Sequence, residues 1–551
     1  MTILSMNRKA LEKAIGKVDE AMEKSITDMG TPIEYVNDEE VAVEVFPNRP
    51  DLLSLQNFAR AVNQYRGKGK LANFNVKSSG EKLIVDKSLP KEWPYAIACI
   101  IKGVKFDDER IKEVIDIQEK LGMGILRKRK KGGIGLYPLE KIEFPIKFVG
   151  KKPEDIKFKP LEFPRVINGR QILGQHPTGR DYAHICQDWD VFPIFVDNAG
   201  TIMSMPPIIN SHDVGKIDET TKDIFLEATG TNLHALKKAF NIIAISLAAM
   251  GGQIYSIDCK QQDGKVISAP DLSGEKMDFK VEDINKMLGV DFSEKKVKEY
   301  LSRMGIGVES TGDDPKGPKC KAIVPAYRTD ILHWVDLAEE VAIAHGYDNF
   351  EPILPEISTI AEEDPKSKSK KVISNVLAGL GLLEVNSFHI NTKKDVKKIH
   401  YGLTDFIELE DSKTGRDVLR VDLLTNMMQI LYENSDASYP HKIFEVGRVF
   451  SKDTSQEAGV IENEKLSVVL SDEKVNFTDL KQILDYLFKM LEVEYEIKDG
   501  SHVGFIDGRC GEVVVNGKSI GYIGEVNPRV LKNWKIKMPA VALEIDLEGL
   551  I

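Results

Sequence analysis

The sequence predicts a multidomain protein that combines α/β and α+β domains. Its 551 residues suffice for three or four domains, each with its own hydrophobic core. Strand-like apolar runs alternate with helical patterns from residue 93 to about 260, which is typical of an α/β domain. The charged tract Glu362–Lys371 then interrupts this pattern, either as a domain boundary or as the basic start of a helix. Beyond the tract, a last α/β domain is predicted to reach Ile551.

Residues 1–90 are predicted to form the first domain. A helix at about residues 7–16 and short strands precede a second helix, which follows Pro47-Asn-Arg-Pro-Asp51. Pro50 fixes the chain at the entrance of this helix, and Asp51 or Ser54 can cap it. Apolar residues continue at helical spacing as far as Gly67, a residue type that often ends helices. These apolar residues are Leu52, Leu55, Phe58, Ala59, Val62 and Tyr65.

Residues 91–265 are predicted to form the second domain, which opens with a strand at 93–105. Five consecutive cations, Arg127–Lys131, lie within it. Such a run can hold RNA phosphates, or it can be a solvated loop. A polar, turn-rich connection at 267–275 leads into the next domain.

Residues 270–352 are predicted to form a small third domain of helical or winged/helical type, with helices at 281–288 and 293–304. A further helix follows, with apolar residues at i, i+4 and i+7 and with Gly346 placed to end it. Four carboxylates lie at its start and in the loop before it: Asp330, Asp336, Glu339 and Glu340. Hard oxygen ligands of this kind suit Mg²⁺. The alternative is a solvated acidic first turn, which the helix dipole also favours.

Composition excludes several classes of protein. The formal net charge is −11, with 75 Lys and Arg against 86 Asp and Glu. This acidic balance argues against nonspecific coating of nucleic acid, because such binding depends on neutralising phosphates. Five scattered cysteines without C-x-x-C spacing fit the reducing cytoplasm and indicate neither disulfides nor a zinc site. No apolar run is long enough to predict a membrane-spanning helix.

The order Arg328-x-Asp-Ile, then Asp336-Leu-x-Glu-Glu-Val, then Gly346-Tyr-Asp resembles the B5 domain of the phenylalanine–tRNA ligase beta subunit. This resemblance implies that Asp330, Asp336, Glu339 and Glu340 bind a structural Mg²⁺. Residues 48–54, Asn-Arg-Pro-Asp-Leu-Leu-Ser, resemble the N-terminal B1 signature of the same family. For that motif we expect a structural role, with Arg49 bridging to a carboxylate.

Residues 91–265 resemble the B3/B4 tRNA-editing domain of the family. The motifs that carry this resemblance are His176-Pro-Thr-Gly-Arg-Asp-Tyr-Ala-His184, Phe192-Pro-Ile-Phe-Val-Asp197, Ser204–Ser211 and Asp223–Asn232. The resemblance implies hydrolysis of mischarged Tyr-tRNA(Phe), with Glu227 receiving the phenol hydroxyl. The residues expected to position the ester and the water are Asn210, Ser211, Thr229 and Thr231. The alternative is that Glu227 faces solvent from a strand and that Thr229-Gly-Thr231 is a turn.

Residues 360–551 resemble the catalytic-like B6/B7 domain, which implies a class II synthetase-like antiparallel sheet flanked by helices. The motifs that carry this resemblance are Ser387–Ile390, Asp422–Met427, Ile443–Val449, Phe477–Lys481 and Phe505–Arg509. The family's catalytic relatives use a Gly-x-Gly-x-Gly-x-x-Arg stretch to hold ATP, and this stretch is absent from residues 360–551. No P-loop and no G-x-G-x-x-G occurs in the sequence either. The domain is therefore expected to serve as an interface without an ATP site.

The motifs follow one another in the family's order, and the length resembles the archaeal and eukaryotic branch. The resemblance implies an α₂β₂ ligase that charges tRNA(Phe), with ATP and phenylalanine bound by the alpha subunit. Two other functions remain open. One is a free-standing deacylase of mischarged tRNA, and the other is a scaffold subunit with an inactive editing pocket.

Overall fold

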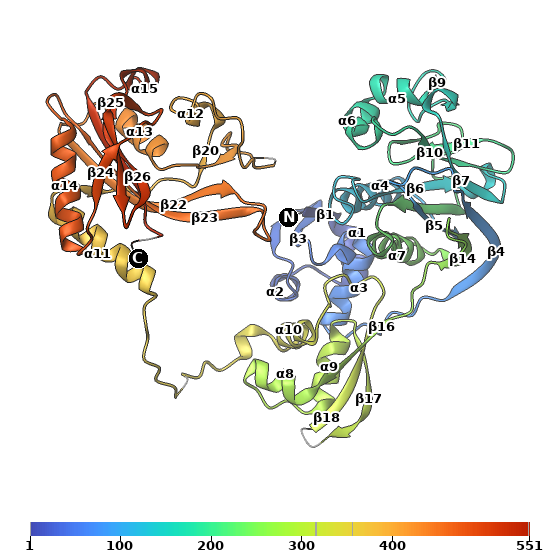
Figure 1. Ribbon diagram of the computed structural model, residues 1–551. Coiled ribbons are helices and arrows are strands. Elements are labelled where there is room, and N and C mark those ends of the chain that lie inside the picture. Colours follow the sequence, from blue (N-terminus) through green and yellow to red (C-terminus); the bar gives the residue numbers. More distant parts are fainter. Residues whose placement is uncertain (1, 315–316, 355, 411, 549, 551) are drawn as a thin grey trace. The chain divides into compact units, whose positions relative to one another are not determined.

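The computed structural model describes residues 2–314, 317–354, 356–410, 412–548 and 550. The chain divides into two compact units, Met1–Ile353 and Leu354–Ile551 (Figure 1). The expected charged tract at 362–371 falls in the second unit, where Pro365 begins helix α11 (Pro365–Gly379) and Asp364 caps it. The tract is therefore the start of a helix. All five cysteines are free, and no helix of the described residues is long and apolar enough to cross a membrane.

The first unit begins with a small antiparallel sheet of order β1-β3-β2. Its strands and helices are β1 (Thr2–Asn7), α1 (Arg8–Ile15), α2 (Glu20–Asp28), β2 (Ile33–Val36), β3 (Glu40–Val45) and α3 (Leu55–Tyr65). Helix α3 begins later than the apolar pattern predicts, because Pro50–Leu52 form a separate 3₁₀ turn. Ser54 caps α3 by accepting a hydrogen bond from the Asn57 amide, which settles the choice between Asp51 and Ser54.

A ten-stranded mixed sheet of order β12-β11-β10-β7-β4-β14-β5-β13-β6, with β15 beside β14, forms the centre of the first unit. The strands are β4 (Val76–Val85), β5 (Tyr95–Lys102), β6 (Gly132–Pro138), β7 (Ile146–Lys151), β10 (Phe192–Val196), β11 (Ile202–Met205), β12 (Ile209–Asn210), β13 (Ile224–Gly230), β14 (Gln253–Lys260) and β15 (Val266–Ala269). Strand β4 runs parallel to β14 and β7, and the other pairings are antiparallel.

Helices cover this sheet, and a short antiparallel pair lies beside it. These elements are α4 (Asp108–Met123), β8 (Lys157–Phe158), β9 (Ile167–Asn168), α5 (Gly169–Gln175), α6 (Pro177–Cys186) and α7 (Leu233–Ala249). Residues Ala239–Leu247 of α7 are almost entirely buried, because this helix packs against β5 and β13 on one side and α3 on the other. The side-chain amide of Asn57 donates a hydrogen bond of 2.8 Å to Ser246 Oγ across the α3–α7 contact.

The third region of the first unit was expected to be a small helical or winged/helical domain, and it combines helices with a sheet. Its elements are β16 (Glu275–Lys280), α8 (Val281–Leu288), α9 (Glu294–Arg303), β17 (Gly307–Asp314), β18 (Gly317–Val324) and α10 (Trp334–His345). The strands pair antiparallel in the order β16-β18-β17. The hairpin escapes prediction because its strands are rich in charged and glycine residues, which give little apolar alternation.

The second unit is built on a seven-stranded sheet of order β19-β22-β23-β27-β26-β25-β24, antiparallel except for β19 with β22. Its further elements are β19 (Leu383–Glu384), β20 (Ile390–Asn391), α12 (Lys393–Val396), β21 (Val418–Leu419), α13 (Leu424–Glu433), β22 (His441–Lys452), β23 (Val460–Ser471), α14 (Phe477–Met490), β24 (Glu496–Asp499), β25 (Phe505–Val515), β26 (Lys518–Val526), α15 (Pro528–Trp534) and β27 (Ala540–Asp546). Successive residues of β23 face opposite sides: Val468 packs into one core and Val469 into another.

Candidate functional site

A buried polar group lies where β13 and β6 pair in the first unit. Glu227 stands opposite Gly135, and Phe225 stands opposite Tyr137. A Cβ atom on Gly135 would collide with Glu227 Oε1, so this position must lack a side chain for the carboxyl group to occupy its place. Ser204 and Asn210 pair across the nearby strands β11 and β12. We refer to Tyr137, Ser204, Asn210, Glu227 and Thr229 as the Glu227 cluster.

Hydrogen bonds connect three members of the Glu227 cluster. The Tyr137 hydroxyl lies 3.2 Å from Glu227 Oε1 and 3.3 Å from Asn210 Oδ1. Three other buried polar atoms have no hydrogen bond of good geometry among the described residues: Ser204 Oγ, Glu227 Oε2 and Thr229 Oγ1. Of these, Ser204 also lies close enough to Tyr137 to lower the pKa of its hydroxyl. Buried polar groups are normally paired, because leaving one unpaired costs about 1–3 kcal/mol. Three of them in one cluster indicate a place for a ligand.

Burial controls the ionisation of the Glu227 cluster. Removal from water raises the pKa of Glu227 to about 8, although the hydrogen bond from Tyr137 lowers it. Burial, together with the nearby Glu227, also raises the pKa of Tyr137 well above its usual range. At neutral pH the Glu227 carboxyl is therefore mainly a neutral acid, which can donate one hydrogen bond and accept others.

The structure gathers some of the predicted editing residues and separates others. Glu227 and Thr229 are buried within β13, so the alternative of a solvent-facing glutamate and a turn at residue 229 is wrong. Ser211 is buried, but its hydroxyl accepts from the Asp213 amide. Thr231 is exposed, and its hydroxyl donates to the Lys131 carbonyl. The hydroxyls of Ser211 and Thr231 therefore form their hydrogen bonds outside the Glu227 cluster.

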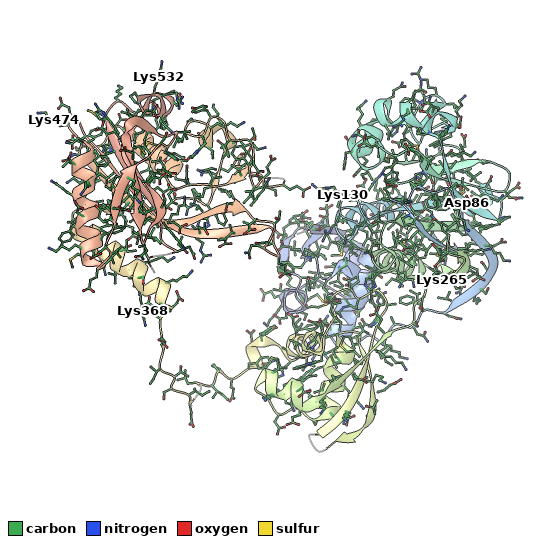
Figure 2. The ribbon with its side chains drawn as sticks, in the orientation of Figure 1. Asp86, Lys130, Lys265, Lys368, Lys474 and Lys532 are labelled. Carbon is green, nitrogen blue, oxygen red and sulfur yellow. The ribbon has the colours of Figure 1, made fainter. Side chains whose placement is uncertain are left out.

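Tyr137 and Ser204 were not anticipated as members of the cluster. The one available signal was Gly132-Gly-Ile-Gly135, because glycines inside a strand often mark the close approach of another group. One residue of the basic run, Arg129, has internal contacts that a solvated loop residue would lack. Arg129 donates to the carbonyls of Pro207 and Ile208 at 3.2 and 3.1 Å, and it lies over the Tyr182 ring. Lys130 of the same run is exposed (Figure 2).

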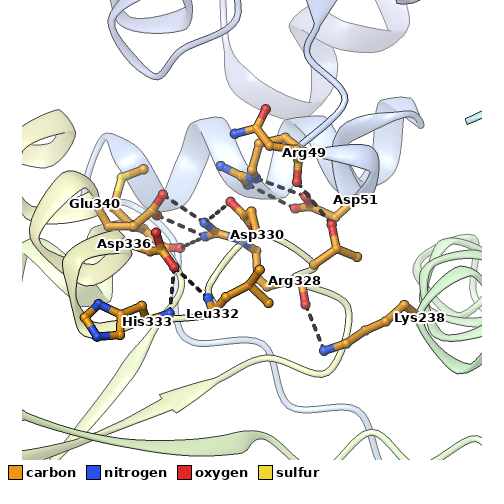
Figure 3. Close-up of polar contacts among 12 residues, drawn as sticks. Arg49, Asp51, Lys238, Arg328, Asp330, Leu332, His333, Asp336 and Glu340 are labelled. Carbon is orange, nitrogen blue, oxygen red and sulfur yellow. Dashed lines mark hydrogen bonds and ion pairs between the residues drawn. The ribbon is translucent and has the colours of Figure 1, made fainter. Parts of the chain in front are cut away.

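A second buried polar group surrounds Arg328 at the start of α10 (Figure 3). The Arg328 guanidinium contacts both oxygens of Asp330 at 2.8 Å, and it contacts Glu340 at 2.8 and 3.0 Å. It also donates to the Met304 carbonyl. Arg328 is only 2% exposed, so its charge depends on these internal partners. We refer to Arg328, Asp330, Asp336, Glu339 and Glu340 as the Arg328 cluster.

The other two acids of the Arg328 cluster have different surroundings. Asp336 Oδ2 accepts hydrogen bonds from the amides of Leu332 and His333, both at 2.7 Å, so it caps α10. Glu339 is exposed. Partial burial raises its pKa, as does repulsion from Glu340, Asp336 and Asp330. Arg328 therefore does not neutralise all of the negative charge in the cluster.

The chemistry of the four acids fits Mg²⁺, since all are oxygen donors and Glu339 lies in an excess of negative charge. The arrangement is not a ready-made metal site, however. In the part of the chain that the structure describes, no three acidic, histidine or cysteine side chains are placed to hold one ion. Asp330 and Glu340 already bind Arg328.

The expected bridge from Arg49 to a carboxylate is present in the 48–54 motif. Arg49 forms two hydrogen bonds of 3.0 Å with Asp51, as a planar guanidinium does with a carboxylate. Both residues line a small pocket next to Arg328. Thr329 donates to the Asn48 carbonyl. The motif therefore joins the N-terminal region to the loop that carries the Arg328 cluster.

The second unit contains a cavity of about 800 Å³ on one face of its sheet. Three ion pairs line it: His400–Asp422, Lys465–Glu544 and Lys452–Asp405. Burial alone would raise the pKa of Asp422, but the hydrogen bond and charge of His400 lower it. The Leu423 and Leu424 amides donate to Glu544. The charges in this cavity are thus largely matched by one another.

Sequence models of two domains match this architecture. The tRNA synthetase B5 domain matches residues 277–347, and the phenylalanyl tRNA synthetase beta chain CLM domain matches residues 351–547. An N-terminal fragment of the phenylalanyl-tRNA synthetase beta subunit from Pyrococcus horikoshii is 30% identical in sequence. The match has a TM-score of 0.59 and covers 62% of this chain and 99% of the fragment. The fold and sites thus define a chain of an aminoacyl-tRNA synthetase.

Relatives extend this match over most of the chain. The phenylalanine–tRNA ligase beta subunit of Pyrococcus abyssi is 36% identical over 506 residues, which cover 91% of this chain and 90% of the relative. The corresponding subunit of Archaeoglobus fulgidus is 31% identical, with coverage of 100% of this chain and 98% of the relative. The chain belongs to the family of phenylalanine–tRNA ligase beta subunits, in its archaeal type, and the predicted family is confirmed.

Proposed function

We propose that this chain is the subunit of an α₂β₂ phenylalanine–tRNA ligase that removes tyrosine from mischarged Tyr-tRNA(Phe). In this assembly the alpha subunit binds ATP and phenylalanine in the cytoplasm and forms the adenylate. Residues 1–90, 91–265, 270–352 and 360–551 serve as the N-terminal, editing, B5 and catalytic-like domains. The observation that carries the editing proposal is the set of buried, unpartnered polar atoms in the Glu227 cluster.

The need for editing follows from the chemistry of selection. An apolar pocket for phenylalanine rejects tyrosine weakly, because an added hydroxyl carries only a modest penalty there. A separate hydrolytic pocket can instead bind that hydroxyl. Glu227 Oε2 is buried and free to accept a hydrogen bond from the phenol. Its neighbours Ser204 and Thr229 offer two further hydroxyl groups without partners in the described residues.

The hydrolysis needs a positioned ester and a water molecule. Water adds to the ester carbonyl, and the bond from this carbon to the ribose oxygen then breaks. Tyrosine leaves, and the ribose oxygen regains a proton. Asn210 is placed to donate from its amide nitrogen, since its oxygen faces Tyr137. Ser211 and Thr231 remain proposed contributors, and they would have to exchange their present hydrogen bonds for contacts with the substrate.

We assign a separate, structural task to the second unit. Its largely antiparallel sheet with flanking helices supports a class II synthetase-like fold. The sequence lacks the glycine-rich ATP-binding stretch, so the unit serves assembly with the alpha subunit. The test is phenylalanine-dependent pyrophosphate exchange. The chain alone should show none, whereas activity in the absence of the alpha subunit would contradict this assignment.

Mg²⁺ is proposed for the Arg328 cluster. Asp336 and Glu339 would bind it, together with oxygens of Asp330 and Glu340. The ion would hold the start of α10 and would take no part in the chemistry, because Mg²⁺ that assists phosphoryl transfer lies beside the nucleotide.

Deacylation of Tyr-tRNA(Phe) separates the proposed function from its two alternatives. The assembled ligase should hydrolyse Tyr-tRNA(Phe) much faster than Phe-tRNA(Phe). A free-standing deacylase would be fully active without an alpha subunit and would not associate with one. A scaffold with an inactive pocket would support charging and leave Tyr-tRNA(Phe) intact.

A further inference from the structure

The Tyr137 hydroxyl has one proton but two hydrogen-bonding contacts. A phenol carries one proton, yet this oxygen lies within reach of two acceptor atoms, Glu227 Oε1 and Asn210 Oδ1. Tyr137 is completely buried and Glu227 is 2% exposed, so water does not compete for these contacts. When the Tyr137 hydroxyl donates to Asn210 Oδ1, its contact with Glu227 Oε1 needs a second proton, which a neutral Glu227 supplies.

We propose that Tyr137 is a positioning residue of the editing pocket, joining Glu227 and Asn210 through a directed chain of hydrogen bonds. In this chain, Glu227 Oε1–H donates to the Tyr137 oxygen, and the Tyr137 hydroxyl donates to Asn210 Oδ1. The inference rests on the proposed editing function. It assigns to Tyr137 no contact with the reacting atoms.

This order of donors leaves the right groups free for substrate. With its proton on Oε1, Glu227 presents Oε2 as an acceptor, and this is the atom that lacks a partner in the described residues. The phenol of a tyrosyl group can donate to it. With its oxygen bound to Tyr137, the Asn210 side chain can aim only its amide nitrogen at an ester carbonyl. One hydroxyl thereby orients both the recognition group and the ester-binding group.

The sheet holds Tyr137 in this position. Tyr137 stands next to Phe225 across β6 and β13, and their ring centroids are 5.9 Å apart. Gly135, two residues earlier on the same face, leaves the space in which Glu227 Oε1 meets the hydroxyl. The ring therefore has little freedom to rotate away from either partner.

The chain also responds to pH in a defined direction. When Glu227 loses its proton, the Tyr137 proton turns to the new carboxylate, and Asn210 Oδ1 loses its donor. Editing should then decline as pH rises through the pKa of Glu227. In the ionised state the Tyr137 hydroxyl donates to the Glu227 carboxylate, and this hydrogen bond lowers the pKa of Glu227, so its removal should move the decline to higher pH.

The test compares variants of the assembled ligase in deacylation of Tyr-tRNA(Phe) between pH 6.5 and 9. Tyr137→Phe should reduce kcat about tenfold, as expected for one lost buried hydrogen bond, and shift the alkaline decline upward. Glu227→Gln should retain most activity, since an amide can donate to Tyr137 and accept the phenol, and it should lose the decline. Tyr327→Phe is the matched control, because Tyr327 is also buried but lies outside the pocket.

The outcomes distinguish two failures. If the wild-type ligase does not hydrolyse Tyr-tRNA(Phe), the proposed function is wrong. If the wild type is active and Tyr137→Phe matches it in kcat and pH profile, only the role of Tyr137 is wrong. A Tyr137→Phe enzyme that is less heat-stable but unchanged in pH profile would likewise reduce Tyr137 to a packing residue.

Discussion

The Glu227 cluster and the Arg328 cluster are both buried polar groups in the first unit, but they meet the cost of burial differently. Arg328 uses its guanidinium donors on Asp330, Glu340 and a backbone carbonyl. Glu227 keeps one oxygen without a partner and takes a proton in place of a counter-charge. A buried charge with internal partners stabilises a fold, whereas open hydrogen-bonding capacity indicates a site for something from outside. We therefore assign a structural role to the Arg328 cluster and a substrate-binding role to the Glu227 cluster.

Removal of the Arg328 charge should give the largest loss of stability. Arg328→Met leaves Asp330 and Glu340 without their buried counter-charge, which typically costs about 3–5 kcal/mol. We expect this loss in the free energy of unfolding of the first unit, measured by urea denaturation with intrinsic fluorescence. Lys321→Met is the control, because Lys321 is only half-buried and its partner Asp278 is exposed, so that their ion pair is worth about 0–1 kcal/mol. Equal losses in the two variants would remove the structural role of Arg328.

Truncation of Glu227 should affect editing rather than stability. Glu227→Ala deletes the acceptor of the phenol, a loss of about 1.5–3 kcal/mol, or roughly ten- to hundredfold in deacylation of Tyr-tRNA(Phe). Phenylalanine charging should be nearly unchanged. The exposed Glu140→Ala serves as the control. A Glu227→Ala enzyme that edits as well as the wild type would return Glu227 to a role in packing.

The stability of the protein should carry a signature of the neutral Glu227. Because the folded state raises this pKa from its ordinary 4.5 to about 8, the folded chain binds the proton more tightly than the unfolded chain. The stabilisation from this proton is complete below about pH 4.5 and is lost as pH rises toward 8. Glu227→Gln removes the titration. The difference in melting temperature between Glu227→Gln and wild type should therefore shift in favour of the variant from pH 5 to pH 8.5, and a constant difference would contradict a neutral Glu227.

The smallest expected effect concerns Glu339, which lies in the Arg328 cluster but does not touch Arg328 in the described contacts. Under the Mg²⁺ proposal, Glu339→Gln should lose bound magnesium, measured by elemental analysis, and lower the melting temperature by a few degrees in Mg²⁺ buffer. Glu282→Gln, an exposed acid of α8, is the control. No magnesium in the wild type, or a variant equal to or more stable than wild type, would leave Arg328 as the cation of the cluster.

Sequence patterns located the local features of both clusters but not their partners. Helix α8 (Val281–Leu288) lies where its pattern predicts, and the acids at the start of α10 are identifiable from spacing alone. Tyr137 lies 90 positions before Glu227 in the chain, and only the register of β6 and β13 brings the two together. The family resemblance also placed Ser211 and Thr231 with the cluster, although their hydroxyls bind the Asp213 amide and the Lys131 carbonyl instead. Long-range pairing therefore decides which polar residues share a site.

The most direct test of the assignment is a crystal structure of the ligase with a non-hydrolysable 3′-amide analogue of tyrosyl-adenosine. We expect the phenol oxygen within hydrogen-bonding distance of Glu227 Oε2, with Tyr137 still between Glu227 and Asn210. The phenylalanyl analogue should leave Glu227 Oε2 without a ligand contact. Two results would contradict the claim that the unpartnered polar atoms of this cluster mark the substrate site. One is a tyrosyl analogue bound elsewhere, and the other is a protein group that forms a hydrogen bond with Glu227 Oε2.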